Sequence, residues 1–412
     1  MAEYTDREHY IPLRVSDLVD LLCGDKGLSR QDAAMFRQFC TLVTATYHFE
    51  YHQKLAQLKD EYAPFDPDSV TTVVKPLLPE EKQQRLEGLF ERFTWLMERA
   101  NYKRLDRAAL EAAMQEVSLW GINMDVAFDA FERMELFVRG DHVGRRYFKR
   151  WWQFWKQPEE VRVPTYQRLA LILKLRPHKR LPRDIDTQDV YLKLFKDIPK
   201  ADIEMLLPGG RLQMPGLVKL KMSGSFLSGL GYVLFKFFDD ILRLITQGLH
   251  AVTTGVGLMW APVAALLGYG YKQWYGYQFA KKSYTLQLTQ SLYYQTLDSN
   301  AGVLNHLLDE AEEQECREAI LAYYYLLFKA PPNGWRASEL DDYVEMDLER
   351  LAKLKVDFEI EDAIAKLEKL RIVEKVGDHY RAQPLAKALE QLDWTWDNYF
   401  KYNNPEPEAS PL

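Results

Sequence analysis

The sequence predicts an α+β fold that is mainly helical. It comprises a helical amino-terminal lobe with a small antiparallel sheet, one or two membrane helices, and a carboxy-terminal winged-helix-like domain. Three patterns carry this prediction. Apolar residues recur at helical spacing in the first third of the chain, they alternate with period two around residues 161–175, and the stretch 244–271 contains no Asp, Glu, Lys or Arg. A chain of 412 residues, 47% of them hydrophobic, can hold two or three domains.

Residues 1–132 are predicted to form the helical lobe. Ser29, with Asp32 three residues later, is typical of the amino-terminal cap of a helix. The apolar residues that follow at helical spacing are Phe36, Cys40, Val43, Tyr47 and Leu55. After a loop that contains several prolines, two further helices are expected near 80–98 and 106–117.

Residues 133–222 are predicted to form a basic α+β part with an antiparallel sheet over 133–200, because apolar residues alternate with others in the manner of strands. Between Arg145 and Arg183 the chain holds twelve basic and two acidic residues, although its net charge is −7. Positive charge therefore concentrates in this one region.

One segment of the basic part interleaves bulky aromatic residues with cations. Its residues are Arg145, Arg146, Lys149, Arg150, Trp151, Trp152 and Trp155. Indole rings and basic side chains suit the surface of a lipid bilayer that contains anionic lipid. The ordinary structural interpretation is a pair of strands with aromatic rings inside and solvated cations outside, and nucleic acid is a further alternative.

Residues 223–285 are predicted to be the membrane region. The uncharged stretch 244–271 has 28 residues, whereas about 20 are enough to cross a bilayer, and the spanning helix is expected over about 248–271. Small residues at helical spacing predict a face that packs against another helix, which also allows a homo-oligomer. These residues are Gly257, Ala261, Ala265 and Gly268.

The preceding stretch, 223–245, is apolar but carries a stripe of charges, namely Lys236, Asp239, Asp240 and Arg243. It either lies flat in the membrane interface or crosses with the stripe turned toward protein or water. In the crossing arrangement both large domains lie on one side, and the basic flanks predict the cytoplasmic side of a bacterial-type inner membrane. The first residues lack the features of a signal peptide.

Residues 286–400 are predicted to form an acidic winged-helix-like domain, and 401–412 a disordered tail. The expected order is helix, helix, helix, hairpin and helix, with Gly377 and Asp378 in the hairpin turn. From Ala301 onward there are 24 acidic and 13 basic residues. Acidic groups at the start of the third helix would repel phosphates, so nucleic acid is a poor partner and a protein partner is expected.

Three stretches carry a family resemblance: Val190–Gly209, Ser291–Gly302, and Leu307–Glu315 with the helix 319–327. Together they resemble the transmembrane protein 143 family, a domain of unknown function. The resemblance covers roughly residues 160–390. It implies two membrane helices between the Pro-Gly and Tyr-Tyr-Gln motifs, in bacterial proteins and in a mitochondria-associated eukaryotic protein, and it implies no established activity.

The sequence predicts no catalytic residue and no cofactor. His48 and His52 have a spacing that could hold a metal ion, but they do not form the HExxH motif, and two hydrogen-bonded histidines are the ordinary interpretation. Asp66 and Asp68 fit the cap of a turn better than a cation site. The cysteines, which form no CxxC pair, are Cys23, Cys40 and Cys316.

The function predicted first is a membrane-anchored scaffold or adaptor whose cytoplasmic carboxy-terminal domain binds a protein. One alternative is an oligomeric channel or transporter component that uses the charged stripe. A second alternative is a metal-dependent enzyme that uses His48 and His52.

Overall fold

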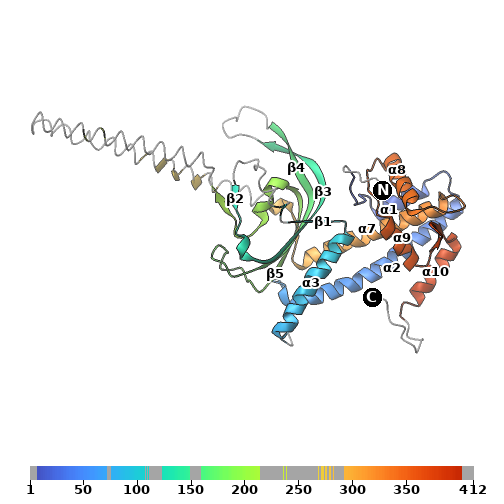
Figure 1. The fold of residues 1–412 in the computed structure, drawn as a ribbon, viewed down its shortest axis with the longest axis horizontal. Coiled ribbons are helices and arrows are strands. Elements are labelled where there is room, and N and C mark those ends of the chain that lie inside the picture. The colour runs from blue at the N-terminus through green and yellow to red at the C-terminus, as the bar shows by residue number, and fades with distance from the viewer. Residues whose placement is uncertain are drawn as a thin grey trace, which may run out of the picture.

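A computed structural model describes most of the chain outside residues 214–291. The described residues are 7–71, 76–106, 108, 110, 123–148, 159–213, 235, 238, 268, 271–272, 274–275, 278–279, 282 and 292–400. Figure 1 shows strands on one side of the molecule and a group of helices at the opposite end, with two long helices running between them.

The main sheet has five strands in the order β1-β3-β4-β5-β7, and every neighbouring pair is antiparallel. The strands are β1 (Lys103–Leu105), β3 (Phe131–Phe148), β4 (Glu159–Leu175), β5 (Val190–Pro199) and β7 (Thr296–Ser299). The predicted antiparallel sheet is thus confirmed. Its edge strand β7 comes from the range that the sequence assigned to the acidic domain. A separate pair joins β2 (Asn123–Asp125) to β6 (Arg211–Gln213).

The helices at Arg30–Tyr62 and Pro79–Arg99 agree with their sequence signals, whereas the helix at Val15–Cys23 was not predicted. These helices are α1 (Val15–Cys23), α2 (Arg30–Tyr62) and α3 (Pro79–Arg99), and the short 3-10 elements are η1 (Ala63–Phe65), η2 (Phe128–Ala130) and η3 (Lys200–Leu206). At the start of α2 the Ser29 hydroxyl accepts the backbone N–H of Asp32 at 3.1 Å, as predicted. Most of the helix expected at 106–117 lies outside the described residues.

Both faces of the sheet are buried because apolar residues occupy successive positions of the central strands. Phe137, Ala170 and Ile172 belong to a core shared with the helices, whereas Leu136, Leu169 and Leu171 belong to a second core on the other face. The ring of Phe93 on α3 meets Phe137 at a centroid distance of 5.8 Å. Helix α3 therefore packs on the sheet (Figure 1).

The carboxy-terminal elements follow the predicted order of helices and hairpin. They are α7 (Ala301–Phe328), α8 (Ala337–Ala352), α9 (Ile360–Lys369), β8 (Val373–Val376), β9 (His379–Ala382) and α10 (Leu385–Asp397). Gly377 occupies the hairpin turn with φ +62°, a conformation that glycine adopts without strain. Trp335 adds a bridge to the hairpin by pairing with Tyr380.

One hydrophobic core extends from the amino-terminal helices into the carboxy-terminal ones. Buried residues from α1, α2, α3, α7, α8, α9 and α10 all belong to it. The amino-terminal segment also lies against the carboxy-terminal elements, since Glu8 forms a parallel bridge with Val356. The ranges 1–132 and 286–400 are therefore joined by packing in the described part of the chain.

No helix among the described residues is long and apolar enough to cross a membrane. The predicted fold class is therefore wrong in including membrane helices, as judged from the described residues. The two longest helices, α2 with 33 residues and α7 with 28, have sufficient length but carry many charged side chains. Of the predicted segments 223–245 and 248–271, only Phe235, Phe238, Gly268 and Tyr271 are among the described residues.

Candidate functional site

A cluster of buried charges fixes α9 to the rest of the molecule. Lys366 of α9 forms ion pairs with Glu315 at 2.9 Å, Glu318 at 2.5 Å and Asp362 at 2.7 Å. Arg99 of α3 reaches Glu315 at 3.1 Å and Asp362 at 2.8 Å. Burial alone would lower the pKa of Lys366, but the neighbouring carboxylates, Glu318 first, raise it above its ordinary value. The ammonium is therefore protonated, and carboxylates of the same chain balance its charge.

Other ion pairs also connect the amino-terminal part to the carboxy-terminal helices. Arg7 contacts Glu345 at 3.3 Å and Glu349 at 3.0 Å, both on α8. Lys369 at the end of α9 contacts Glu50 of α2 at 3.2 Å. These contacts occupy both lysines of α9, so the third helix of the predicted winged-helix order presents no free lysine to a phosphate backbone.

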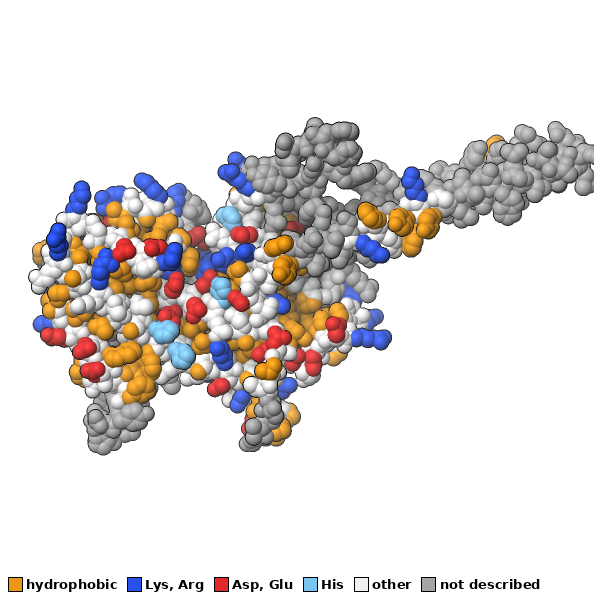
Figure 2. Space-filling view, turned by 180° about the vertical axis from the view of Figure 1, so that it is seen from behind, with side chains coloured by type: hydrophobic (Ala, Val, Ile, Leu, Met, Phe, Trp, Pro, Cys, Tyr) orange, Lys and Arg blue, Asp and Glu red, His pale blue; other side chains and the backbone are white. Residues whose placement is uncertain are grey.

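The surface at the end of α10 consists of exposed aromatic rings and not of buried ion pairs. Trp394 and Phe400 are each 56% exposed and Trp396 is 44% exposed. The ring of Phe49 on α2 lies against two of them, with centroid distances of 6.0 Å to Trp396 and 5.4 Å to Phe400. Trp394 is two residues from Trp396, so its ring projects from another side of the helix. We call Trp394, Trp396 and Phe400 the α10 aromatic surface. Figure 2 shows hydrophobic side chains exposed on the helical body next to acidic and histidine side chains.

The charges around the α10 aromatic surface are mainly negative. Helix α10 carries Glu390, Asp393 and Asp397 against the single cation Lys387, and it has no basic residue in its last turn. Carboxylates at the carboxy-terminal end of a helix add to the negative end of its dipole, which costs stability. Their position therefore calls for an explanation other than the stability of the helix.

A second polar cluster joins the start of α7 to the sheet. His306 contacts Asp298 of β7 through Nδ1 at 2.7 Å and Glu310 through Nε2 at 3.7 Å. Glu310 also accepts from the Tyr102 hydroxyl at 2.8 Å and pairs with Arg139 at 3.0 Å. Burial would raise the pKa of Glu310, but the contact with His306 and the charge of Arg139 outweigh it and lower the pKa to about 2.

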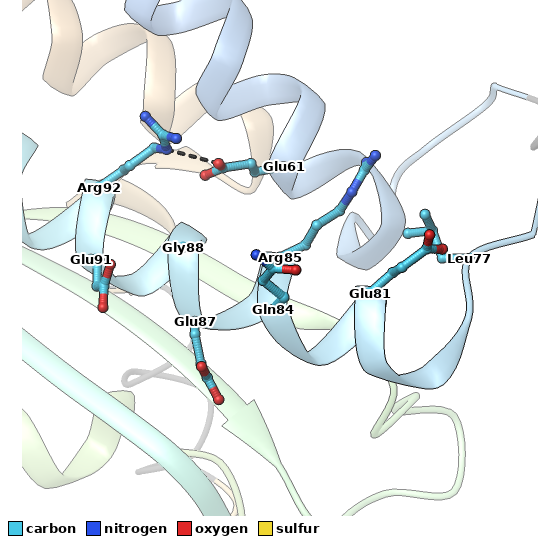
Figure 3. A pocket seen from close by; sticks show the side chains of 9 residues that line it. All are labelled: Glu61, Leu77, Glu81, Gln84, Arg85, Glu87, Gly88, Glu91 and Arg92. Atoms are coloured by element: carbon cyan, nitrogen blue, oxygen red, sulfur yellow. Dashed lines mark hydrogen bonds and ion pairs between the residues drawn. The ribbon is translucent and has the colours of Figure 1, made fainter. Parts of the chain in front are cut away.

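A groove with a volume of about 500 Å³ lies between the end of α2 and the start of α3. In Figure 3, Glu61 and Arg92 point toward each other, and their ion pair measures 2.7 Å. Glu87 and Glu91 point away from that pair. The groove thus contains solvated charges and one ion pair, without a nucleophile next to a base.

His48 and His52 lie where the sequence places them, one turn apart on α2, with ring centroids 6.4 Å apart. His48 contacts Glu312 of α7 at 3.1 Å. No group of three or more His, Cys, Asp or Glu residues within the described ranges could hold a metal ion. Asp66 accepts the backbone N–H of Asp68 at 3.1 Å, which is the expected turn cap.

Most residues of the predicted charged stripe, helix-packing face and membrane-surface segment lie outside the described residues. This holds for Lys236, Asp239, Asp240 and Arg243, for Gly257, Ala261 and Ala265, and for Lys149, Arg150, Trp151, Trp152 and Trp155. Gly268 is described and exposed. Arg145 and Arg146 lie on β3, opposite Arg162 and Val161 of β4, and the Arg145 side chain is exposed. The channel interpretation and the membrane localisation therefore stay predictions.

The sequence analysis missed the α10 aromatic surface. Its signal was present in the segment Asp393-Trp-Thr-Trp-Asp397, where acidic residues flank two tryptophans at the end of a helix. A spacing of two residues does not place both rings on one helix face, so helical periodicity alone did not mark them as a surface.

Residues 159–302 match the model of a family described as "Protein of unknown function (DUF3754)". The matched part comprises β4, β5 and β7 and ends at Gly302, just inside α7. It therefore includes Asp298, while His306 and the α10 aromatic surface lie beyond it. No solved structure matches the chain.

Proposed function

We propose that this protein is an adaptor whose carboxy-terminal unit, α8 to α10, has a winged-helix-like arrangement and binds another protein. The observation that carries the proposal is the α10 aromatic surface, three large exposed rings at the acidic end of one helix. Tryptophan rings are common anchors of protein interfaces, because they bury much area at a low cost in conformational entropy.

The charges favour a partner with a basic segment and an apolar anchor. The acidic residues near the rings are Glu390, Asp393 and Asp397. A cationic segment would offset their mutual repulsion and the negative end of the α10 dipole, while its apolar side chain would cover Trp394. Nucleic acid fits poorly, since the lysines of α9 are occupied by ion pairs within the chain.

Photo-cross-linking in cells that express the full chain tests the proposal. A photoreactive phenylalanine analogue at the position of Asp393, which is exposed beside Trp394, should form a discrete product with another protein. The same analogue at Val70, which is 97% exposed in a loop after α2, is the control. We expect the product at position 393 only, and its yield should fall in the Trp394→Ser variant.

Equal products at both positions, or an unchanged yield in Trp394→Ser, would contradict the proposal. A product with twice the mass of the chain would show that the surface joins two copies instead. Deleting the carboxy-terminal part is the poorer experiment, because α7 contributes many buried residues to the shared core and its loss would unfold the protein.

A further inference from the structure

A small cavity lies where four helices meet. Its volume is about 220 Å³, and its lining comes from α2, α3, α7 and α9. Tyr47, Tyr51 and Trp95 form an aromatic wall, and Lys54 and Arg99 bring positive charge to it. None of these residues belongs to the α10 aromatic surface, so the cavity is a separate feature of the molecule.

The cations around the cavity differ in how they are neutralised. Arg99, Lys366 and Lys369 each form an ion pair with a carboxylate of the chain. Lys54 forms none among the described residues, and its ammonium instead lies over the rings of Trp95 at 4.2 Å and Tyr51 at 5.0 Å. An attraction to an aromatic face replaces only part of the hydration that the ammonium loses.

The surroundings of Lys54 disfavour its charge. Burial is the main reason that its pKa lies below the ordinary value, and the positive charges of Lys369 and Arg99 act in the same direction. Glu50 and Glu315 act against them. An additional anion in the cavity would stabilise the charged form of Lys54.

Arg99 lies beside the same space and can contribute a second donor. Its ion pairs with Glu315 and Asp362 all run through Nη1 in the described part of the chain. The guanidinium is planar and carries further N–H groups, which suits a carboxylate or phosphate next to Lys54.

We propose that this cavity binds a small organic anion, with the anionic group on the Lys54 ammonium and an aromatic or other apolar body against Tyr51 and Trp95. Pockets for drug-sized ligands measure roughly 300–1,000 Å³, so this smaller cavity fits a molecule with about one ring. A carboxylate and a phosphate monoester share the required chemistry. The inference does not depend on the proposed adaptor function.

Isothermal titration of the full chain tests this inference with benzoate, phenyl phosphate and inorganic phosphate as probes. We expect one saturable site for benzoate or phenyl phosphate, and the tighter of the two identifies the anionic group. Inorganic phosphate should bind more weakly, because it has no apolar body. Lys54→Met should weaken binding by roughly 10- to 100-fold, since a hydrogen bond to a charged group is lost.

The matched control is Lys59→Met, which removes an exposed cation from the same helix outside the cavity lining. Circular dichroism shows whether each variant is folded, and Lys54→Gln provides a second substitution if the apolar one perturbs α2. Three results would overturn the proposal: no saturable binding of either aromatic probe, affinity in both Lys54 variants unchanged from that of the unsubstituted protein, or inorganic phosphate binding as tightly as phenyl phosphate.

Discussion

We call Lys366 and its charged neighbours Arg99, Glu315, Glu318 and Asp362 the Lys366 cluster. This cluster buries charged side chains, whereas the α10 aromatic surface exposes apolar ones. In the Lys366 cluster, carboxylates from α7 and α9 neutralise the buried ammonium of Lys366. At the end of α10, large apolar rings and carboxylates face solvent together. Lys366 and Lys369 thus attach α9 to other elements of the chain, whereas the end of α10 presents rings and negative charge to solvent.

The largest effect is expected from Lys366→Met. Removing the ammonium leaves Glu315 and Glu318 buried without their counter-charge, and breaking a buried ion pair in this way costs about 3–5 kcal/mol. Urea unfolding followed by circular dichroism measures the change in the free energy of unfolding. The control is Lys369→Met on the same helix, where the exposed pair with Glu50 should cost at most about 1 kcal/mol. Equal losses in the two variants would show that the ion pairs of Lys366 do not hold α9 in place.

The next effect concerns the junction between Trp335 and the hairpin. Gly334 has φ +78°, and a Cβ atom there would lie 2.3 Å from the carbonyl oxygen of Tyr380. We expect Gly334→Ala to cost about 1–3 kcal/mol, because backbone strain and a contact with main-chain atoms act together. Gly377→Ala is the control, since Gly377 also has positive φ but open space around it. Thermal unfolding should show the larger loss for Gly334→Ala, and the reverse order would contradict the described geometry.

A smaller, pH-dependent effect is expected at His306. The carboxylates of Glu310, at 3.7 Å, and Asp298, at 2.7 Å, raise the pKa of His306 above the ordinary value. A raised pKa means that the folded state binds the proton more tightly, so this stabilisation is present below about pH 6.5 and is lost as the pH rises through the folded-state pKa.

His306→Gln should therefore lose more stability at pH 6 than at pH 8.5, by up to about 1 kcal/mol for this partly exposed group. Urea unfolding at the two pH values measures the difference. His52→Gln, at an exposed histidine of α2, is the control and should lose the same amount at both. A loss at His306 that does not change with pH would show that its two carboxylate contacts do not stabilise the protonated ring.

The smallest effect on stability is expected at the α10 aromatic surface. Trp394 is more than half exposed, so Trp394→Ser should change the free energy of unfolding by no more than about 0.5 kcal/mol. Thermal unfolding checks this value in the same samples that are cross-linked through position 393. A large loss of stability would mean that the ring serves the fold, and the comparison with the Lys366 cluster would then fail.

Local structure was predictable from the sequence wherever a short pattern determines it. The Ser29 cap, the alternation in β4 and the Gly377 turn each depend on a few neighbouring residues. The long-range arrangement was not predictable in this way. Helical spacing shows that Tyr323 and Phe39 face a core, but it does not show that their rings stack at 4.0 Å across separately predicted domains.

The candidate sites show the same limit. Lys366 joins residues that are far apart in sequence, and no spacing rule connects Arg99 to Asp362. His48 and His52 were predicted as neighbours because one helix turn separates them, whereas a third metal ligand would need tertiary information. The membrane helices were predicted for residues 223–271, most of which lie outside the described residues, whereas the helices that the structure describes bury their apolar residues against one another and against the sheet.

We propose that the α10 aromatic surface binds a segment of another protein that carries basic residues and a large apolar side chain. Mass spectrometry of the peptide cross-linked through the position of Asp393 tests it most directly. We predict a peptide from a different protein, rich in Lys or Arg, with a large apolar residue at or next to the attachment point. An acidic peptide, or a peptide from this chain itself, would contradict the claim.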